Sequence, residues 1–329
     1  MSVRPSAPPS SRSATTRRPP AAFRWGHRLQ LGAGLADFAA RGFHCARPAS
    51  RETLERHARA FLDGFNTAVR SAPSTTHEEL GRVHATERGF AYEGAGMAYA
   101  LLDTALLGRG RRTTALLEGP GRAYPHLVHV GVGWALARLR HPGARGLLGL
   151  DPLHQWLTLD GHGFSHGFFG GRAAVARYAR GATPGRAAAV RHQGLGRSLW
   201  FLEAADPDRI ARTVGAFPED RRGHLWSGVG LAACYAGGAD DEELDRLRAH
   251  AGPYGPDLAQ GAAFAAEARR HAGHVPEHTR RAVPRLTGAD VDTAADWTVA
   301  AHGELLGDGS LDDYLLWRAL IARRALAAG

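Results

Sequence analysis

The sequence contains no lysine, only two cysteines and no apolar run approaching the roughly 20 residues that a membrane helix needs. All 41 basic residues are arginine, which together with abundant alanine and glycine indicates a GC-rich bacterial coding sequence. Cys45 and Cys234 can form at most one disulfide and have neither metal-binding nor redox spacing. These absences exclude a disulfide-stapled scaffold and a membrane-spanning chain, and we expect a cytoplasmic protein.

Acidic residues are absent from the first 28 positions, which carry six arginines and most of the formal net charge of +9. Setting those six aside leaves 35 arginines against 32 acidic residues, so the rest of the chain is nearly balanced. This balance gives no support to a nucleic-acid partner. Residues 1–22 are rich in Pro, Ser and Arg and are predicted to form a disordered tail. Residues 23–329 are predicted to form one domain.

Signatures of common enzymes are missing as well. The chain has no phosphate-binding loop, no G-x-S-x-G and no H-E-x-x-H. The stretch Asp290-Val-Asp292 is similar to the acidic motif of class II terpenoid cyclases, but it lacks one aspartate. We therefore interpret Asp290 as a helix N-cap, and the acidic run 240–243 as a solvated helix start.

Glycine recurs at the head of apolar, helix-like stretches with steps of 30–37 residues. A period in the low thirties is the length of one helical hairpin, and such hairpins must stack to bury their apolar faces. No stretch alternates with the period of a strand. The sequence predicts an all-α fold of helical-hairpin repeats of about 33 residues, forming an α-solenoid or a closed α/α toroid. The recurring glycines are Gly94, Gly131, Gly161, Gly194, Gly228 and Gly261.

These glycines have two interpretations. They can allow neighbouring helices to pack closely, or they can mark helix N-termini whose open amides face a shared cavity and hold a polar ligand. The pattern favours packing, and both can hold at one site. Between the second and third glycine helices we expect a short helix over 151–159, followed by a long helix over 164–180.

Two charged residues stand in apolar stretches. Glu93 lies in GFAYEGAGMAYALL and Arg197 in GLGRSLWFL, where an unpaired charge would be costly. Glu93 is either a general acid or base with a raised pKa or the ion-pair partner of an arginine such as Arg122 or Arg197. Arg197 is either that partner or an anchor for a carboxylate or phosphate.

Two histidine pairs have spacings that place both imidazoles on one helix face. They are His126 with His129 and His162 with His166, and Asp160 is close enough in sequence to serve as a further ligand. With 18 histidines in the chain, accidental pairs are expected, so we predict structural histidines, no metal and no cofactor. The candidate catalytic residues are Glu93, His129, His166 and Arg197.

Further residues near the glycines are candidates for an apolar binding pocket, although such residues are more often part of the core. The candidate substrate-binding residues are Trp134, His162, Phe168, Trp200, Trp226 and Gln260.

Several segments together resemble a bacterial family of unknown function whose members are encoded beside enediyne polyketide synthases. The resemblance runs from about residue 36 to 286 and is most specific from 192 to 238. It implies a role in making or tailoring an enediyne core, and it brings no catalytic residues. The segments include GFAYEGAGMAYALLD, LDPLHQWLTLDGHGFSHGFF, HQGLGRSLWFLEAADPDRIARTVGAFPEDRRGHLWSGVGLAACYAGG and LAQGAAFAAEARRHAG.

Two functions follow as expectations. In the first, the protein is an accessory factor that binds a hydrophobic polyene-like molecule or a polyketide synthase component, since stacked hairpins present extended surfaces. In the second, it is an enzyme that cyclises or otherwise tailors a linear polyene or isoprenoid, with acid–base residues in a toroid pocket.

Overall fold

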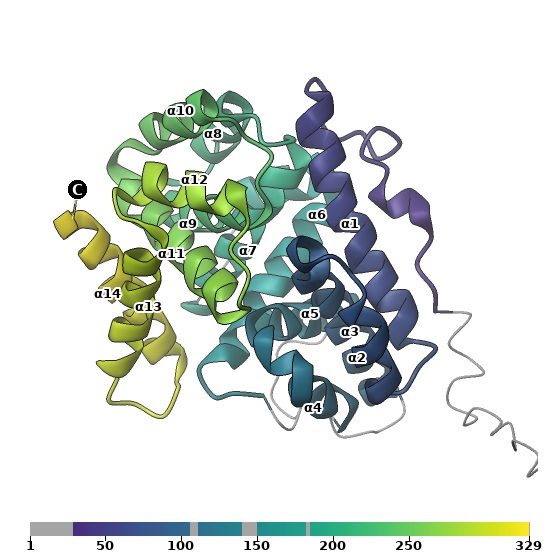
Figure 1. Cartoon of the computed structure of the whole chain (residues 1–329). Coiled ribbons are helices and arrows are strands. Elements are labelled where there is room, and N and C mark those ends of the chain that lie inside the picture. The colour runs from purple at the N-terminus through teal and green to yellow at the C-terminus, as the bar shows by residue number, and fades with distance from the viewer. Residues whose placement is uncertain (1–28, 106–110, 140–149, 182–184, 329) are drawn as a thin grey trace, which may run out of the picture.

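Helices make up the fold of this protein, as the computed structural model in Figure 1 shows. The structure describes residues 29–105, 111–139, 150–181 and 185–328. No strand occurs in these ranges, so the prediction of an all-α fold is confirmed for them. No helix within them is long and apolar enough to cross a membrane. The tail predicted for 1–22 lies outside the described residues.

The long helices form a row in which each packs against the next along the chain. One long helix, Ala187–Leu202, lies within this row between two others. Residues 192–205, which include most of that helix, are buried without interruption, so neighbours cover it on all sides. The row consists of α1 (Pro48–Ala68), α3 (Ala85–Ala105), α5 (Pro125–Arg138), α6 (Leu157–Arg180), α7 (Ala187–Leu202), α9 (Glu219–Ala236) and α11 (Gly255–His271).

Shorter helices connect and cover this row. At one side of the molecule, α10 packs against α8 and α12, and at the other side α2 and α4 lie together (Figure 1). The last two helices, α13 and α14, pack on α11. The shorter elements are α2 (Pro73–Gly81), α4 (Arg111–Leu117), α8 (Pro207–Gly215), α10 (Asp241–Ala251), α12 (Glu277–Thr287), α13 (Val291–Gly303) and α14 (Leu311–Ala328), with 3₁₀ turns at Ala33–Ala36, Gly119–Ala123, His154–Trp156 and Gly252–Tyr254.

Asp290 caps a helix, as predicted, and the acidic run 240–243 lies at a helix start, as predicted, but Glu243 of this run is buried and not solvated. Asp240 Oδ1 accepts a hydrogen bond from the Glu243 backbone N–H at 3.0 Å at the start of α10. Asp290 Oδ1 accepts from the Thr293 N–H at 2.7 Å at the start of α13. The side chain of Asp290 therefore satisfies a free helix amide.

The repeating glycines lie inside the helices, so the prediction that they open the helices is wrong. Gly94 is in the middle of α3, and Gly228 is in the middle of α9. A Cβ on Gly228 would lie well within 3.0 Å of the carbonyl oxygen of Gln193 on the preceding long helix. A Cβ on Gly230 would overlap the carbonyl of Leu258 on the following one. The glycines serve close helix packing.

The same contact recurs along the whole row. In each glycine pair, the first glycine faces the previous long helix and the second faces the next. Any side chain at these positions would push two backbones apart. The first glycines of the pairs, with the carbonyls that they meet, are Gly94 with Phe61, Gly131 with Glu93, Gly161 with Val130, Gly194 with Asp160 and Gly228 with Gln193. Gly261 has no second glycine two residues later, but it meets the Ser227 carbonyl in the same way.

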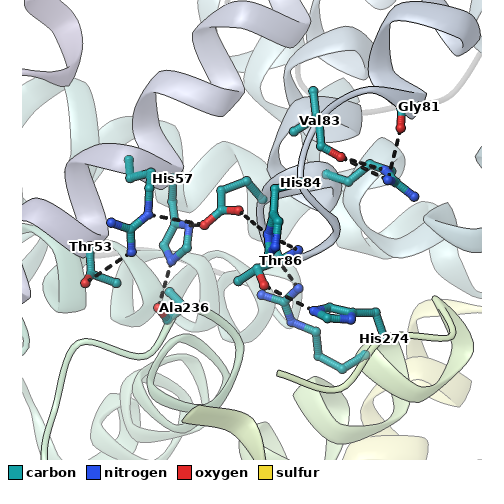
Figure 2. A network of polar contacts seen from close by, with 12 residues as sticks. Thr53, His57, Gly81, Val83, His84, Thr86, Ala236 and His274 are labelled. Carbon is teal, nitrogen blue, oxygen red and sulfur yellow. Dashed lines mark hydrogen bonds and ion pairs between the residues drawn. The ribbon is translucent and has the colours of Figure 1, made fainter. Parts of the chain in front are cut away.

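A polar network joins the first helices of the row to the last (Figure 2). His57 Nε2 on α1 donates to the carbonyl of Ala236 at 2.8 Å. The side chain of Thr86 on α3 hydrogen-bonds to His274 at 3.1 Å, and its carbonyl accepts from Arg269 Nη1 at 2.9 Å. Segments nearly 200 residues apart in sequence are therefore held side by side.

We predict that Gly230→Ala lowers the free energy of unfolding by about 3 kcal/mol, because its Cβ would overlap the Leu258 carbonyl. Chemical denaturation followed by circular dichroism measures this. Gly215→Ala is the matched control, because Gly215 is exposed in α8 and its added Cβ would meet no atom within 4 Å. That variant should be neutral or up to about 1 kcal/mol more stable. Equal losses in both variants would contradict the packing role.

Candidate functional site

Three charged side chains meet in the interior of the protein. Arg197 on α7 donates from Nη1 to Asp160 Oδ1 on α6 at 2.5 Å. Its Nη2 lies 3.6 Å from Glu93 Oε1 on α3. Trp134 Nε1 on α5 donates to the same Glu93 oxygen at 3.1 Å. We call Glu93, Asp160 and Arg197 the central cluster.

The glycine contacts determine where the two acids of the central cluster lie. Glu93 and Asp160 each directly precede the first glycine of a pair, and their own carbonyls meet the glycine of the next long helix. This register places the position before each glycine in the helix interface, where both acids are at most 2% exposed. The other residues at this position are Val130, Gln193, Ser227 and Gln260, which are buried as well.

The central cluster has more acid than base. One guanidinium faces two carboxylates, so both acids can ionise only at the cost of an uncompensated buried charge. Burial and the neighbouring Asp160 raise the pKa of Glu93 to about 7, against the opposing effects of Arg197 and Trp134. Burial also raises the pKa of Asp160, although Arg197 opposes this. A carboxyl group with a pKa of about 7, as Glu93 has, can donate or accept a proton near neutral pH.

An aromatic cavity adjoins the central cluster on one side. Its volume is about 30 Å³, enough for a water molecule, and both Glu93 and Arg197 line it. The guanidinium carbon of Arg197 lies 4.9 Å from the centre of the Phe164 ring. The aromatic residues of this lining are His57, Phe61, Phe90, Trp134, Phe164, Phe168, Phe169 and Phe201.

A second small cavity, of about 40 Å³, also adjoins the central cluster. Asp160 and Arg197 line it together with Tyr235 and Trp317. Asp160 Oδ2 and the Tyr235 hydroxyl are buried without a hydrogen-bond partner among the described residues. The central cluster therefore borders two small cavities and retains an unused carboxylate oxygen on Asp160.

The structure brings together four of the residues singled out from the sequence, namely Glu93, Trp134, Phe168 and Arg197. It places the candidate histidines elsewhere. His129 Nδ1 donates to the Pro125 carbonyl at 2.7 Å, and its Nε2 accepts from the Asp151 N–H at 3.2 Å. Both ring nitrogens of His129 are thus used in local structure.

His162 and His166 lie side by side on α6, with ring centres 4.6 Å apart. They line a separate cavity with Arg177, Tyr178 and Arg191. In the part of the chain that the structure describes, no group of three or more His, Cys, Asp or Glu residues is arranged to hold a metal. Asp160 is bonded to Arg197 instead.

The remaining candidates belong to other parts of the interior. Trp200 Nε1 donates to the Gly237 carbonyl at 2.8 Å, which ties α7 to the end of α9. Trp226 is buried in the hydrophobic core. Gln260 Oε1 accepts from Ser227 Oγ at 2.6 Å and lies beside Arg318 on α14.

The sequence reasoning missed the pairing of Asp160 with Arg197 and the burial of Gln193, whose Nε2 donates to the Tyr314 hydroxyl at 3.5 Å. Asp160 and Gln193 both directly precede a repeating glycine, as Glu93 does, and that shared position is the signal that could have found them. It also missed Arg318, which stands in the apolar stretch LLWRALIA in the same way that Arg197 stands in its helix.

The fold and the site define a class of all-helical proteins whose long helices pack through glycine pairs around buried charged residues. The chain matches the family described as "Protein of unknown function (DUF1702)" over residues 28–325 and belongs to that family. The expectation of a family of unknown function is thereby confirmed. No curated protein and no solved structure matches the chain.

The central cluster predicts a pH-dependent stability. Because the pKa of Glu93 is raised from 4.5 to about 7, the folded protein binds more protons than the unfolded chain between these values. The free energy of unfolding therefore falls as pH rises through this window. Glu93→Gln removes this penalty and should gain up to about 3 kcal/mol relative to wild type between about pH 5 and pH 8.

Chemical denaturation at a series of pH values measures this gain. The matched control is Glu78→Gln, because the Glu78 side chain is 67% exposed. Its stability should follow that of the wild type at every pH. If Glu93→Gln also runs parallel to the wild type, Glu93 ionises normally and the central cluster is an ordinary ion-pair network.

Proposed function

We propose that this protein binds an apolar, polyene-like small molecule in the aromatic cavity and acts as an accessory protein in enediyne-type polyketide biosynthesis. The observation that carries the binding proposal is the aromatic lining beside a buried, incompletely neutralised carboxylate. Aromatic faces stack on conjugated systems, and the few polar groups at one end of the cavity can orient a ligand.

The aromatic cavity must widen for such a ligand, because about 30 Å³ is far less than the volume of a polyene. Phe169 is the most accessible aromatic residue of this lining and lies only half-buried in α6, two residues before the kink at Gly171. We propose rotation of its ring as the movement that opens the cavity toward solvent.

Two further considerations support the proposal. The biosynthetic setting comes from the sequence resemblance to proteins encoded beside enediyne polyketide synthases. The contacts of α1 and α3 with α9 and α11 favour a closed toroid over an open solenoid, and a closed ring of helices provides a central binding cavity. An accessory protein needs only to bind the small molecule and does not need to catalyse a reaction on it.

A second candidate is an enzyme that isomerises or cyclises the bound polyene. The raised pKa of Glu93 favours it, since a carboxyl that titrates near neutrality suits proton transfer to or from a conjugated chain. Arg197 would hold Asp160 as its counter-ion while Glu93 changes its protonation state. Binding is shared by both candidates, and only the second needs the proton of Glu93.

Binding is tested with diphenylhexatriene, a neutral fluorescent polyene whose emission rises in apolar surroundings. We predict saturable binding to the full-length wild-type protein. Phe169→Ser should weaken it about tenfold, because a polar group replaces aromatic contact at the cavity edge. Leu316→Ser is the matched control, since Leu316 is exposed on α14, away from the cavity. Absence of saturable binding, or equal effects of both variants, would overturn the proposed site.

The two candidates are separated in the native bacterium by deleting the gene, complementing it with variants and profiling metabolites. We expect the deletion to accumulate a polyene shunt product that the wild-type gene removes. If Glu93→Gln rescues as well as Glu78→Gln does, the accessory role holds. If the Glu93→Gln gene fails to rescue the deletion although the Glu93→Gln protein still binds diphenylhexatriene, the proposal of an enzyme is supported. A deletion with an unchanged polyene profile contradicts both.

A further inference from the structure

A larger cavity lies apart from the central cluster, between α7, α9, α11 and α14. Its volume is about 620 Å³, within the range of small-molecule binding sites. It opens to solvent beside Arg186 and Ala319, which are exposed, and its inner wall includes the buried residues His192, Gln260 and Arg318.

Arg318 is the most unusual residue of this cavity. It is 5% exposed, yet no carboxylate among the described residues lies within 4.0 Å of its guanidinium. Its Nε donates to Gln260 Oε1 at 3.3 Å, while its Nη1 is buried without a hydrogen-bond partner. A buried guanidinium without a directly paired carboxylate is costly. Burial lowers the pKa of Arg318, although the more distant Asp257 and Asp160 oppose this.

Gln260 places a second unused donor next to Arg318. Its Oε1 accepts from both Ser227 Oγ and Arg318 Nε, which fixes the amide orientation. Its Nε2 is therefore the free end, and it is buried without a partner. Two neighbouring side chains thus offer unused N–H groups at one end of the cavity, which is the arrangement that binds an anion.

The rest of the lining indicates a single negative charge on the ligand. Burial lowers the pKa of His192 to about 4 and that of His224 to about 3, so neither adds a positive charge at neutral pH. Three arginines, Arg186, Arg221 and Arg318, line the cavity with two acids, Asp220 and Asp257, so the lining has one net positive charge and favours a monoanion over a dianion such as phosphate. The apolar part of the wall, suited to a hydrocarbon body, consists of Ala188, Ala189, Leu315, Ala319 and Ala322.

We infer that this cavity is a second ligand site that binds a small molecule with one carboxylate and an apolar body. Arg318 and Gln260 hold the carboxylate, and the alanine-rich wall covers the body. This inference is independent of the proposed polyene site, because Arg318 and Gln260 do not line the aromatic cavity and Glu93 does not line this one.

The test uses isothermal titration of the full-length protein with 4-phenylbutyrate, its neutral amide and inorganic phosphate. We expect 4-phenylbutyrate to bind at least about tenfold more tightly than either of the other probes. Arg318→Met should weaken 4-phenylbutyrate binding at least about tenfold. Arg323→Met is the matched control, since Arg323 is an exposed arginine on the same helix, and it should bind as the wild type does.

Gln260→Glu keeps the size of the side chain and guards against a folding defect. A carboxylate at position 260 would neutralise Arg318 internally, so binding should fall while the thermal midpoint of unfolding rises. Equal binding of 4-phenylbutyrate and its amide, or unchanged binding in Arg318→Met, would overturn the inference. Tighter binding of phosphate than of the carboxylate would also overturn it.

Discussion

The close approach of each long helix to the backbone of its neighbours is the contact on which the rest of the structure depends. Glycine pairs in successive helices meet the carbonyls of the previous and the next helix, and no side chain fits there. This contact fixes the register between helices as well as their spacing. Because the register repeats, the residue before each first glycine is always carried into the interface.

The buried polar residues follow from that register. At two of these positions the chain has an acid, Glu93 and Asp160, and Arg197 reaches both from α7. At Gln260 the same position supports Arg318 across the interface with α14. One structural rule therefore produces two different polar sites, one with an excess of carboxylate and one with an unpaired guanidinium. Each excess is costly in an apolar interior and is a reason to expect a ligand or a proton there.

The sequence predicted the helical class and the possible Glu93–Arg197 ion pair, because glycine spacing and charges in apolar stretches are local signals. It placed the glycines at helix starts, which is wrong. A glycine that caps a helix and a glycine that packs against a neighbouring backbone cannot be distinguished from a single sequence. In place of the short helix expected at 151–159, the structure has a 3₁₀ turn at His154–Trp156 that leads directly into α6 (Leu157–Arg180). This long helix begins before the expected residue 164 and is kinked at Gly171. The meeting of Arg197 with Asp160, and of Arg318 with Gln260, depends on tertiary packing. The position before a repeating glycine marks Asp160 and Gln260 as interface residues, but it does not say which residues they meet.

The central claim is that the glycine register holds a carboxyl that is protonated near neutral pH in an apolar interior. Infrared difference spectroscopy of the carboxyl C=O stretch, recorded as a function of pH, tests it most directly. The account predicts a protonated-carboxyl band that titrates near pH 7 in the wild type and is absent from Glu93→Gln. A wild-type protein without such a band at about pH 5 would contradict it, because both acids would then be ionised beside Arg197.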